Sequence, residues 1–247
     1  MSNYLNEKEY KFGIFFKTLT FLSAFTGVFF QLYARNFVNG ATIFRAFTTQ
    51  SNIWIGSLCL VFLILDIKNK GLREYPVWLY NLKFMFTTSI ILTYIVFAVL
   101  LTPLMSFSYL VSPSNIFLHV LTPIFAVIDY LVCDKGINKD KKYTYILPLI
   151  MPLLYAVFFI SLYEILDELP VEYFFLDYRT YGWFDFRNNG IGVVYWTVIQ
   201  CSFLVIIGRF LLNLKNKTKT INTKMLVLVT LLIMLGITAS TVLVSLL

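Results

Sequence analysis

Seven long apolar runs, separated by short polar connections, dominate the pattern of this chain. A helix that crosses the hydrocarbon core of a bilayer, about 30 Å thick, needs roughly 20 residues. Each run has about that length, so the pattern predicts an all-α, polytopic membrane bundle of about seven transmembrane helices in one domain, residues 1–247. The runs are Lys11 to Tyr33, Phe47 to Ile67, Leu82 to Leu104, Asn115 to Cys133, Tyr143 to Leu166, Gly190 to Leu212 and Met225 to Leu247.

Composition supports a membrane protein. The chain is 59% hydrophobic and 13% charged, with a mean hydropathy of +0.77. A soluble globule of 247 residues cannot cover so much apolar surface. The net charge of +7 lies in the connections between runs, so nucleic acid is not an expected partner, whereas membrane lipids or lipid-like small molecules are. The first run is too long for the apolar region of a cleaved signal peptide.

The basic residues predict the orientation. Seven spans place 16 of the 20 Lys and Arg residues on one side, because all except Arg35, Arg45, Arg179 and Arg187 fall there. The positive-inside rule makes that side cytoplasmic. We therefore expect a cytoplasmic N-terminus and an external C-terminus in a cell (plasma) membrane.

The stretch FRAFTTQSN, Phe44 to Asn52, is unusually polar for the start of an apolar run. In the predicted orientation it lies just below the outer surface, at the depth of His119, the only histidine. A neutral imidazole is the usual base that activates a hydroxyl nucleophile, so a threonine of this stretch and His119 can form a catalytic pair. The alternative is structural: Thr48 and Ser51 bond to carbonyls of their own helix, and His119 bonds to a neighbouring helix.

The other ionisable and helix-bending residues receive structural interpretations. Asp129 lies about 15 Å below His119, near the inner interface, where it snorkels or pairs helices. Asp66 and Asp134, at cytoplasmic helix ends, are expected to be solvated. Pro123 removes the usual helical partner of the His119 carbonyl, which is compatible with a cavity or with an ordinary kink. The three cysteines are expected to be packing residues: Cys59, Cys133 and Cys201.

An aromatic loop that follows the fifth run can cover an outer-leaflet cavity. We expect its segment from Glu168 to Gly182 to act as the lid. Glu164 and Asp167, at the end of the fifth run, can supply a carboxylate to His119. A single histidine and no defined ligand run predict neither a metal site nor a cofactor. The carboxylates of this region are Glu164, Asp167, Glu168, Glu172, Asp177 and Asp185.

The order and spacing of FTTQSN, HVLTP, PLLY and FLDYRTYGW resemble predicted six-transmembrane bacterial membrane proteins. These look like distant relatives of the androgen-induced gene and androgen-dependent TFPI-regulating proteins, multi-pass hydrolases of fatty acid esters of hydroxy fatty acids. The resemblance covers residues 11–212, and the helix at about 225–247 is an addition. It implies a Thr48 nucleophile, with Thr49 as the alternative, and a His119 base. Gln50, Ser51 and Asn52 then become candidate donors to the oxyanion. The helix count and the short HxxxP interval depart from the family.

The second function that the pattern allows is a small-molecule transporter or lipid-binding membrane protein without catalysis. Helices bent by proline and polar helix starts can also line a translocation path. Two features of the sequence disfavour transport. It shows no inverted repeat, and it shows no intramembrane charge pair of the kind that couples ions.

Single introduced cysteines test the orientation. A cysteine at Ser112 or Thr180 is expected to react with a membrane-impermeant thiol reagent in intact cells, and one at Asn138 or Asn216 to react only after the cells are opened. The unaltered protein gives the background labelling. The opposite pattern would invert the orientation and place the Thr–His pair in the cytoplasmic leaflet.

Overall fold

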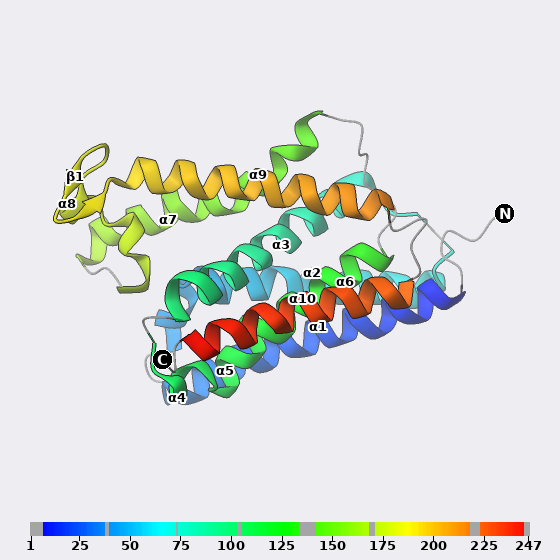
Figure 1. Ribbon diagram of the computed structural model, residues 1–247. Helices are drawn as coiled ribbons and strands as arrows, with labels where there is room; N and C mark the ends of the chain where they lie inside the picture. Colours follow the sequence, from blue (N-terminus) through cyan, green and yellow to red (C-terminus); the bar gives the residue numbers. More distant parts are fainter. Residues whose placement is uncertain are drawn as a thin grey trace.

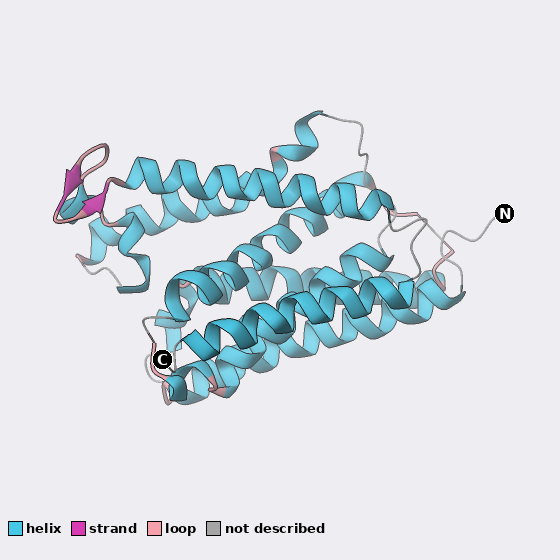
Figure 2. Ribbon diagram, in the orientation of Figure 1, coloured by secondary structure: helices cyan, strands magenta, loops and turns pink. Residues whose placement is uncertain are grey.

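The computed structural model describes residues 7–37, 40–72, 74–102, 105–133, 142–167, 171–217 and 223–244. Helices account for most of these residues, and the sheet in this part of the chain is one antiparallel hairpin of β1 (Phe186–Arg187) and β2 (Gly190–Ile191). Figure 2 shows the hairpin at one end of the bundle, so the predicted all-α class is confirmed.

The long helices are α1 (Glu7–Ala34), α2 (Phe47–Asn69), α3 (Val77–Ile95), α6 (Thr122–Cys133), α7 (Ile150–Leu166), α9 (Val193–Lys217) and α10 (Thr223–Val244). Two π-helical segments extend them: η2 (Val96–Leu101) follows α3, and η4 (Ile116–Leu121) precedes α6. The remaining pieces are short: η1 (Gly40–Arg45), α4 (Phe107–Leu110), α5 (Pro113–Asn115), η5 (Lys142–Tyr145), η6 (Leu147–Leu149), η7 (Val171–Leu176) and α8 (Tyr178–Tyr181).

The long helices run side by side in one bundle (Figure 1). α1 packs against α2 and α6, and α3 contacts α2 and α6 on one side and α7 and α9 on the other. α10 lies against α6 and both π segments. The start of α1 and the end of α10 lie at opposite ends of the bundle, as an odd number of crossings requires.

Six helical stretches are long and apolar enough to cross a membrane: Glu7–Ala34, Phe47–Asn69, Val77–Leu101, Pro113–Cys133, Leu147–Leu166 and Val193–Lys215. They correspond to the first six predicted runs. Within α10 the apolar helix among the described residues, Val227–Ser240, is shorter. The chain is therefore a multi-pass membrane protein, and its seventh crossing stays a prediction.

Local sequence signals fix several helix ends. Pro76 directly precedes α3, and Pro113 opens α5, where a missing amide hydrogen costs nothing. α2 ends at Lys70, whose φ of 51° is left-handed, and Gly71 continues the turn at a φ of 67°. The amide of Gly71 donates to the Asp66 carbonyl, which closes the last turn.

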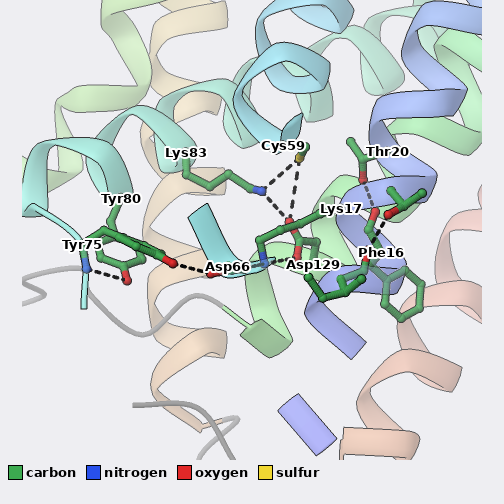
Figure 3. Close-up of polar contacts among 11 residues, drawn as sticks. Phe16, Lys17, Thr20, Cys59, Asp66, Tyr75, Tyr80, Lys83 and Asp129 are labelled. Atoms are coloured by element: carbon green, nitrogen blue, oxygen red, sulfur yellow. Dashed lines mark hydrogen bonds and ion pairs between the residues drawn. The ribbon is translucent and has the colours of Figure 1, made fainter. Parts of the chain in front are cut away.

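A cluster of charged side chains lies between helices inside the bundle (Figure 3). Lys17 of α1 donates to Asp129 of α6 at 3.0 Å and lies 3.4 Å from Asp66 of α2. Lys83 of α3 donates to the other oxygen of Asp129 and to the sulfur of Cys59. The two lysines and Asp129 are each at most 1% exposed. We call Lys17, Asp66, Lys83 and Asp129 the charge cluster.

Two sequence-based expectations are wrong here. Asp66 is buried rather than solvated, and the charge cluster is an intramembrane charge network, which the sequence pattern did not reveal. Of the two roles expected for Asp129, the structure has helix pairing and not snorkelling, because Asp129 is fully buried and bonded to lysines of α1 and α3. Their positions along the predicted helices place Lys17, Lys83 and Asp66 near the membrane interface. The rotation of each helix about its axis, however, directs these side chains towards the neighbouring helices. Asp134 lies outside the described residues.

Tyr75, in the connection between α2 and α3, extends the cluster towards the end of the bundle where these two helices are joined. Its hydroxyl donates to Asp66 at 2.8 Å. Burial, together with this hydrogen bond to Asp66, raises the pKa of Tyr75 above its ordinary value, so the phenol stays a neutral donor.

The charge cluster joins four helices through compensated charges. An isolated buried charge is very costly, whereas a buried charge with matched partners is tolerated. Here two ammonium groups face two carboxylates, so the formal charges balance. The helices that supply them, α1, α2, α3 and α6, cannot separate or rotate without exposing a lone charge to the apolar interior.

Removing one partner therefore tests the cluster. We expect Asp129→Asn to lower the free energy of unfolding by roughly 3–5 kcal/mol, because two buried ammonium groups then face one carboxylate. The double variant Lys83→Met/Asp129→Leu, which leaves the Lys17–Asp66 pair intact, is expected to regain much of this loss. Thermal unfolding in detergent measures both effects.

The matched control is Lys11→Met, which removes a lysine that pairs with Glu7 at the surface, where both side chains are more than 70% exposed. Exposed pairs contribute little, so its midpoint is expected to stay near that of the parent. Equal midpoints for Asp129→Asn and the parent would show that the cluster does not hold the helices together.

Candidate functional site

A cavity of about 540 Å³ lies among α1, α2, α3, α7 and α9. The π segments η2 and η4 and the shorter pieces η1, α4, α5 and η7 also contribute lining residues. Its lining is mixed: arginine, threonine, asparagine, glutamine and histidine side chains occur among leucine, valine, proline and aromatic ones. A volume of this size is typical of sites for small organic ligands.

Thr48 and His119 both line this cavity. Thr48 is half-buried in the first turn of α2, and His119 is buried on η4. The structure thus brings to one cavity two residues that are 71 positions apart, by the difference of their numbers. Their shared depth follows from helices that start at the same end of the bundle.

The π-helical geometry of η4 places the His119 ring. Its imidazole stacks on Phe97 of η2, with ring centroids 3.9 Å apart and planes 15° from parallel. The π segment η4 ends close to Pro123, whose missing amide hydrogen interrupts the α-helical ladder. The predicted opening of the backbone before Pro123 therefore takes the form of a π turn.

One ring nitrogen of His119 lacks a partner: the buried Nδ1 has no hydrogen-bond partner among the described residues. Glu164 and Asp167 do not orient the ring: both pair with Arg179 of α8, which also stacks on an aromatic ring. A carboxylate–histidine pair is thus not part of this site.

The candidate oxyanion donors are engaged elsewhere. The amide of Gln50 donates to the Phe44 carbonyl at 2.8 Å, and that of Asn52 donates to the carbonyls of Thr48 and Leu118. Ser51 bonds to the Thr48 carbonyl and to the Thr93 hydroxyl. None of the three lines the cavity.

The alternative nucleophile Thr49 does not itself line the cavity. It is fully buried, and its hydroxyl donates at 2.9 Å to Gln31 of α1, which is a lining residue. The back-bonding expected of Ser51 in the structural interpretation is therefore present, whereas Thr48 is the threonine of the stretch that reaches the cavity.

Part of the predicted lid lines the cavity. Tyr173, Phe175 and Leu176 of η7 line it, and the backbone amide of Phe47 donates to the Tyr173 hydroxyl at 2.8 Å. Residues 168–170 lie outside the described residues. Asp177 accepts from the amide of Thr180 and so begins α8 after the lid.

Sequence reasoning missed several cavity residues. Thr93 of α3, Asn115 of α5, and Thr197 and Gln200 of α9 bring polar groups to the lining. Cys201, expected to be a packing residue, also lies on this wall. The available signal was a polar residue within an apolar run, at the depth of His119. No group of three His, Cys, Asp or Glu residues placed to hold a metal occurs in the described part of the chain.

No protein-family model, curated protein or solved structure matches the chain. The class is therefore defined by the fold and the cavity. The chain is a helical, multi-pass membrane protein with a partly polar cavity among its spans.

Filling the cavity tests whether it binds a ligand. Ala156 of α7 lines the cavity, so Ala156→Trp is expected to weaken the binding of a fluorescent acyl ester at least tenfold by steric exclusion. Val157→Trp is the control, because Val157 is 66% exposed on the outer surface of α7. Fluorescence titration in detergent gives both affinities. Similar affinities for the two variants would rule out this cavity as the acyl-binding site.

Proposed function

We propose that this protein is a lipid-ester hydrolase that works within the outer leaflet of the cell (plasma) membrane. Thr48 is the nucleophile, and His119 is the general base. The observation that carries the proposal is that both residues line one cavity and that the buried Nδ1 of His119 has no partner there. The outer-leaflet placement rests on the predicted orientation.

The proposed reaction has two halves. His119 takes the Thr48 hydroxyl proton while the threonine oxygen bonds to the ester carbonyl carbon. The bond from that carbon to the alkoxy oxygen then breaks, and the leaving alcohol receives the proton from the imidazolium. Water, deprotonated by His119, attacks the acyl-threonine in the second half. The fatty acid leaves, and Thr48 regains its proton.

The size of the cavity favours an ester with one long acyl chain. A liquid water molecule takes up about 30 Å³, so 540 Å³ corresponds to about 18 waters or a similar number of methylene groups. That space accommodates one long chain with its ester group. The leucine, valine and aromatic part of the lining suits the chain, and the polar part suits the ester.

The family resemblance supports the same pair of residues. The F-T-x-Q-S-N pattern aligns Thr48 with the threonine of a fatty-ester hydrolase family, and His119 with its histidine. The depth argument reaches the same stretch and the same histidine without the family. Thr48 is the threonine of the FRAFTTQSN stretch that lines the cavity, which supports the choice that the resemblance implies.

The charge cluster is the observation that favours transport as a second candidate, because buried ionisable groups often mark ion or proton pathways. Its composition weighs against that role. The formal charges of two ammonium groups and two carboxylates balance, so uptake or loss of a proton would unbalance the network. The cluster is better suited to holding helices than to releasing a proton in each cycle.

A fluorophosphonate probe tests the hydrolase. The parent protein is expected to become covalently labelled at Thr48, and Thr48→Ala and His119→Ala should each reduce labelling at least a hundredfold. Thr49→Ala is expected to retain labelling, since its hydroxyl faces α1. Peptide mass spectrometry locates the adduct.

Labelling that survives both the Thr48 and the His119 substitution would end the hydrolase proposal. Proteoliposomes that take up a labelled acyl ester without cleaving it would favour the transporter instead. An adduct on Thr49 would move the nucleophile by one position and contradict the placement of α2 side chains described above.

A further inference from the structure

Gln200 is an unusual residue for its place in the fold. It lies in the membrane-spanning helix α9, and its side chain lines the cavity. Its amide nitrogen Nε2 is buried and has no hydrogen-bond partner among the described residues. A buried donor without a partner is costly, and the cost is greatest where no water competes. Such a group indicates a partner that is present only when the cavity is filled.

Helical spacing directs Gln200 towards the wall that carries Thr48. Leu204, one turn further along α9, is fully buried and packs with Phe47 and Leu92. Residues four apart share a helix face, so Gln200 projects from the same side of α9 as Leu204. Phe47 and Leu92 directly precede Thr48 and Thr93, which line the cavity. Gln200 and Thr48 thus line the same cavity, one from α9 and the other from the start of α2.

Three other amides near the site already have acceptors. Those of Gln50 and Asn52 donate to backbone carbonyls, and that of Asn115 donates to the Tyr109 carbonyl. Among the described residues, the side-chain nitrogens that are buried without a partner are Nδ1 of His119 and Nε2 of Gln200. Both belong to cavity-lining residues. One is suited to accept a proton from the nucleophile, and the other can only donate a hydrogen bond.

We propose that Gln200 binds the carbonyl oxygen of an ester with one long acyl chain and stabilises the oxyanion that forms on this oxygen. This inference rests on the proposed hydrolase function and deepens it. Nε2 donates its hydrogen to the carbonyl oxygen in the ground state. The bond strengthens as negative charge develops there, which lowers the barrier to attack by Thr48. Gln200 takes the role that the sequence pattern assigned to Gln50, Ser51 and Asn52.

Turnover by substituted proteins gives the first test. Gln200→Leu removes the donor, and Gln200→Glu keeps the shape but replaces Nε2 by oxygen. Both are expected to lower kcat for a single-chain ester by roughly 10²–10³, with KM changed much less, because the bond matters most in the transition state. Ser202→Leu, at an exposed position of the same helix that does not line the cavity, is expected to keep the parent kcat.

The carbonyl stretch of a ¹³C-labelled ester gives a second readout that needs no turnover. Bound to Thr48→Ala protein, the ester carbonyl is expected to absorb at lower frequency than in an apolar solvent, because it accepts a hydrogen bond. Adding Gln200→Leu should return the band to the apolar value. A folded Gln200→Leu protein with parent kcat, or a band unmoved by the substitution, would overturn the role of Gln200.

The two proposals fail in different ways. Loss of turnover on substitution of Thr48 and His119, with parent kcat in both Gln200 variants, would retain the hydrolase and reject the Gln200 assignment. A parent protein that never cleaves an ester, while the carbonyl band still shifts with Gln200, would reject the hydrolase and retain an ester-binding amide. Absence of ester binding would overturn both.

Discussion

The fold depends on the placement of one carboxylate inside a membrane bundle. Both oxygens of Asp129 are bonded to ammonium groups, Lys17 on one side and Lys83 on the other, and Asp66 balances the remaining charge. Four helices must meet in one arrangement for all these charges to be compensated. The apolar contacts between membrane helices are less selective, because lipid tails satisfy apolar surface equally well. The charge cluster therefore specifies which helices are neighbours and which faces they share.

The charge cluster also positions the cavity and its lining residues. Asp129 and His119 lie on one continuous stretch of helix, η4 followed by α6. The contacts that hold Asp129 in place therefore also set the position of the imidazole along the helix axis, apart from any adjustment of the π turn. α3 acts in the same way, because Lys83 belongs to the cluster and Thr93 and Phe97 reach the cavity. The half of the bundle that contains the charge cluster thus supports the other half, which contains the π segments, the stacked histidine and the cavity.

Hydropathy alone predicted the helices well, because length and apolarity decide which segments cross a bilayer. It also predicted the shared depth of Thr48 and His119. Rotation about each helix axis was not predictable. Lys17 and Lys83 were interpreted as interfacial because linear position gives depth without direction, and their partners lie 112 and 46 residues away in sequence. Gln200 was overlooked for the same reason: a lone amide in an apolar run does not reveal which neighbour it faces.

The polar residues of the stretch FRAFTTQSN have different roles: most of them stabilise the backbone and the helix contacts, and one of them faces the cavity. Gln50, Ser51 and Asn52 satisfy carbonyls of the α2 start and of η4, and Thr49 joins α2 to α1. In hydrocarbon such bonds are needed wherever helices begin or the regular ladder is interrupted. Because these side chains meet the structural demand, Thr48 is free to face the cavity. A membrane site for polar chemistry thus requires more polar residues than the reaction uses, since most of them support the backbone that holds the reacting pair.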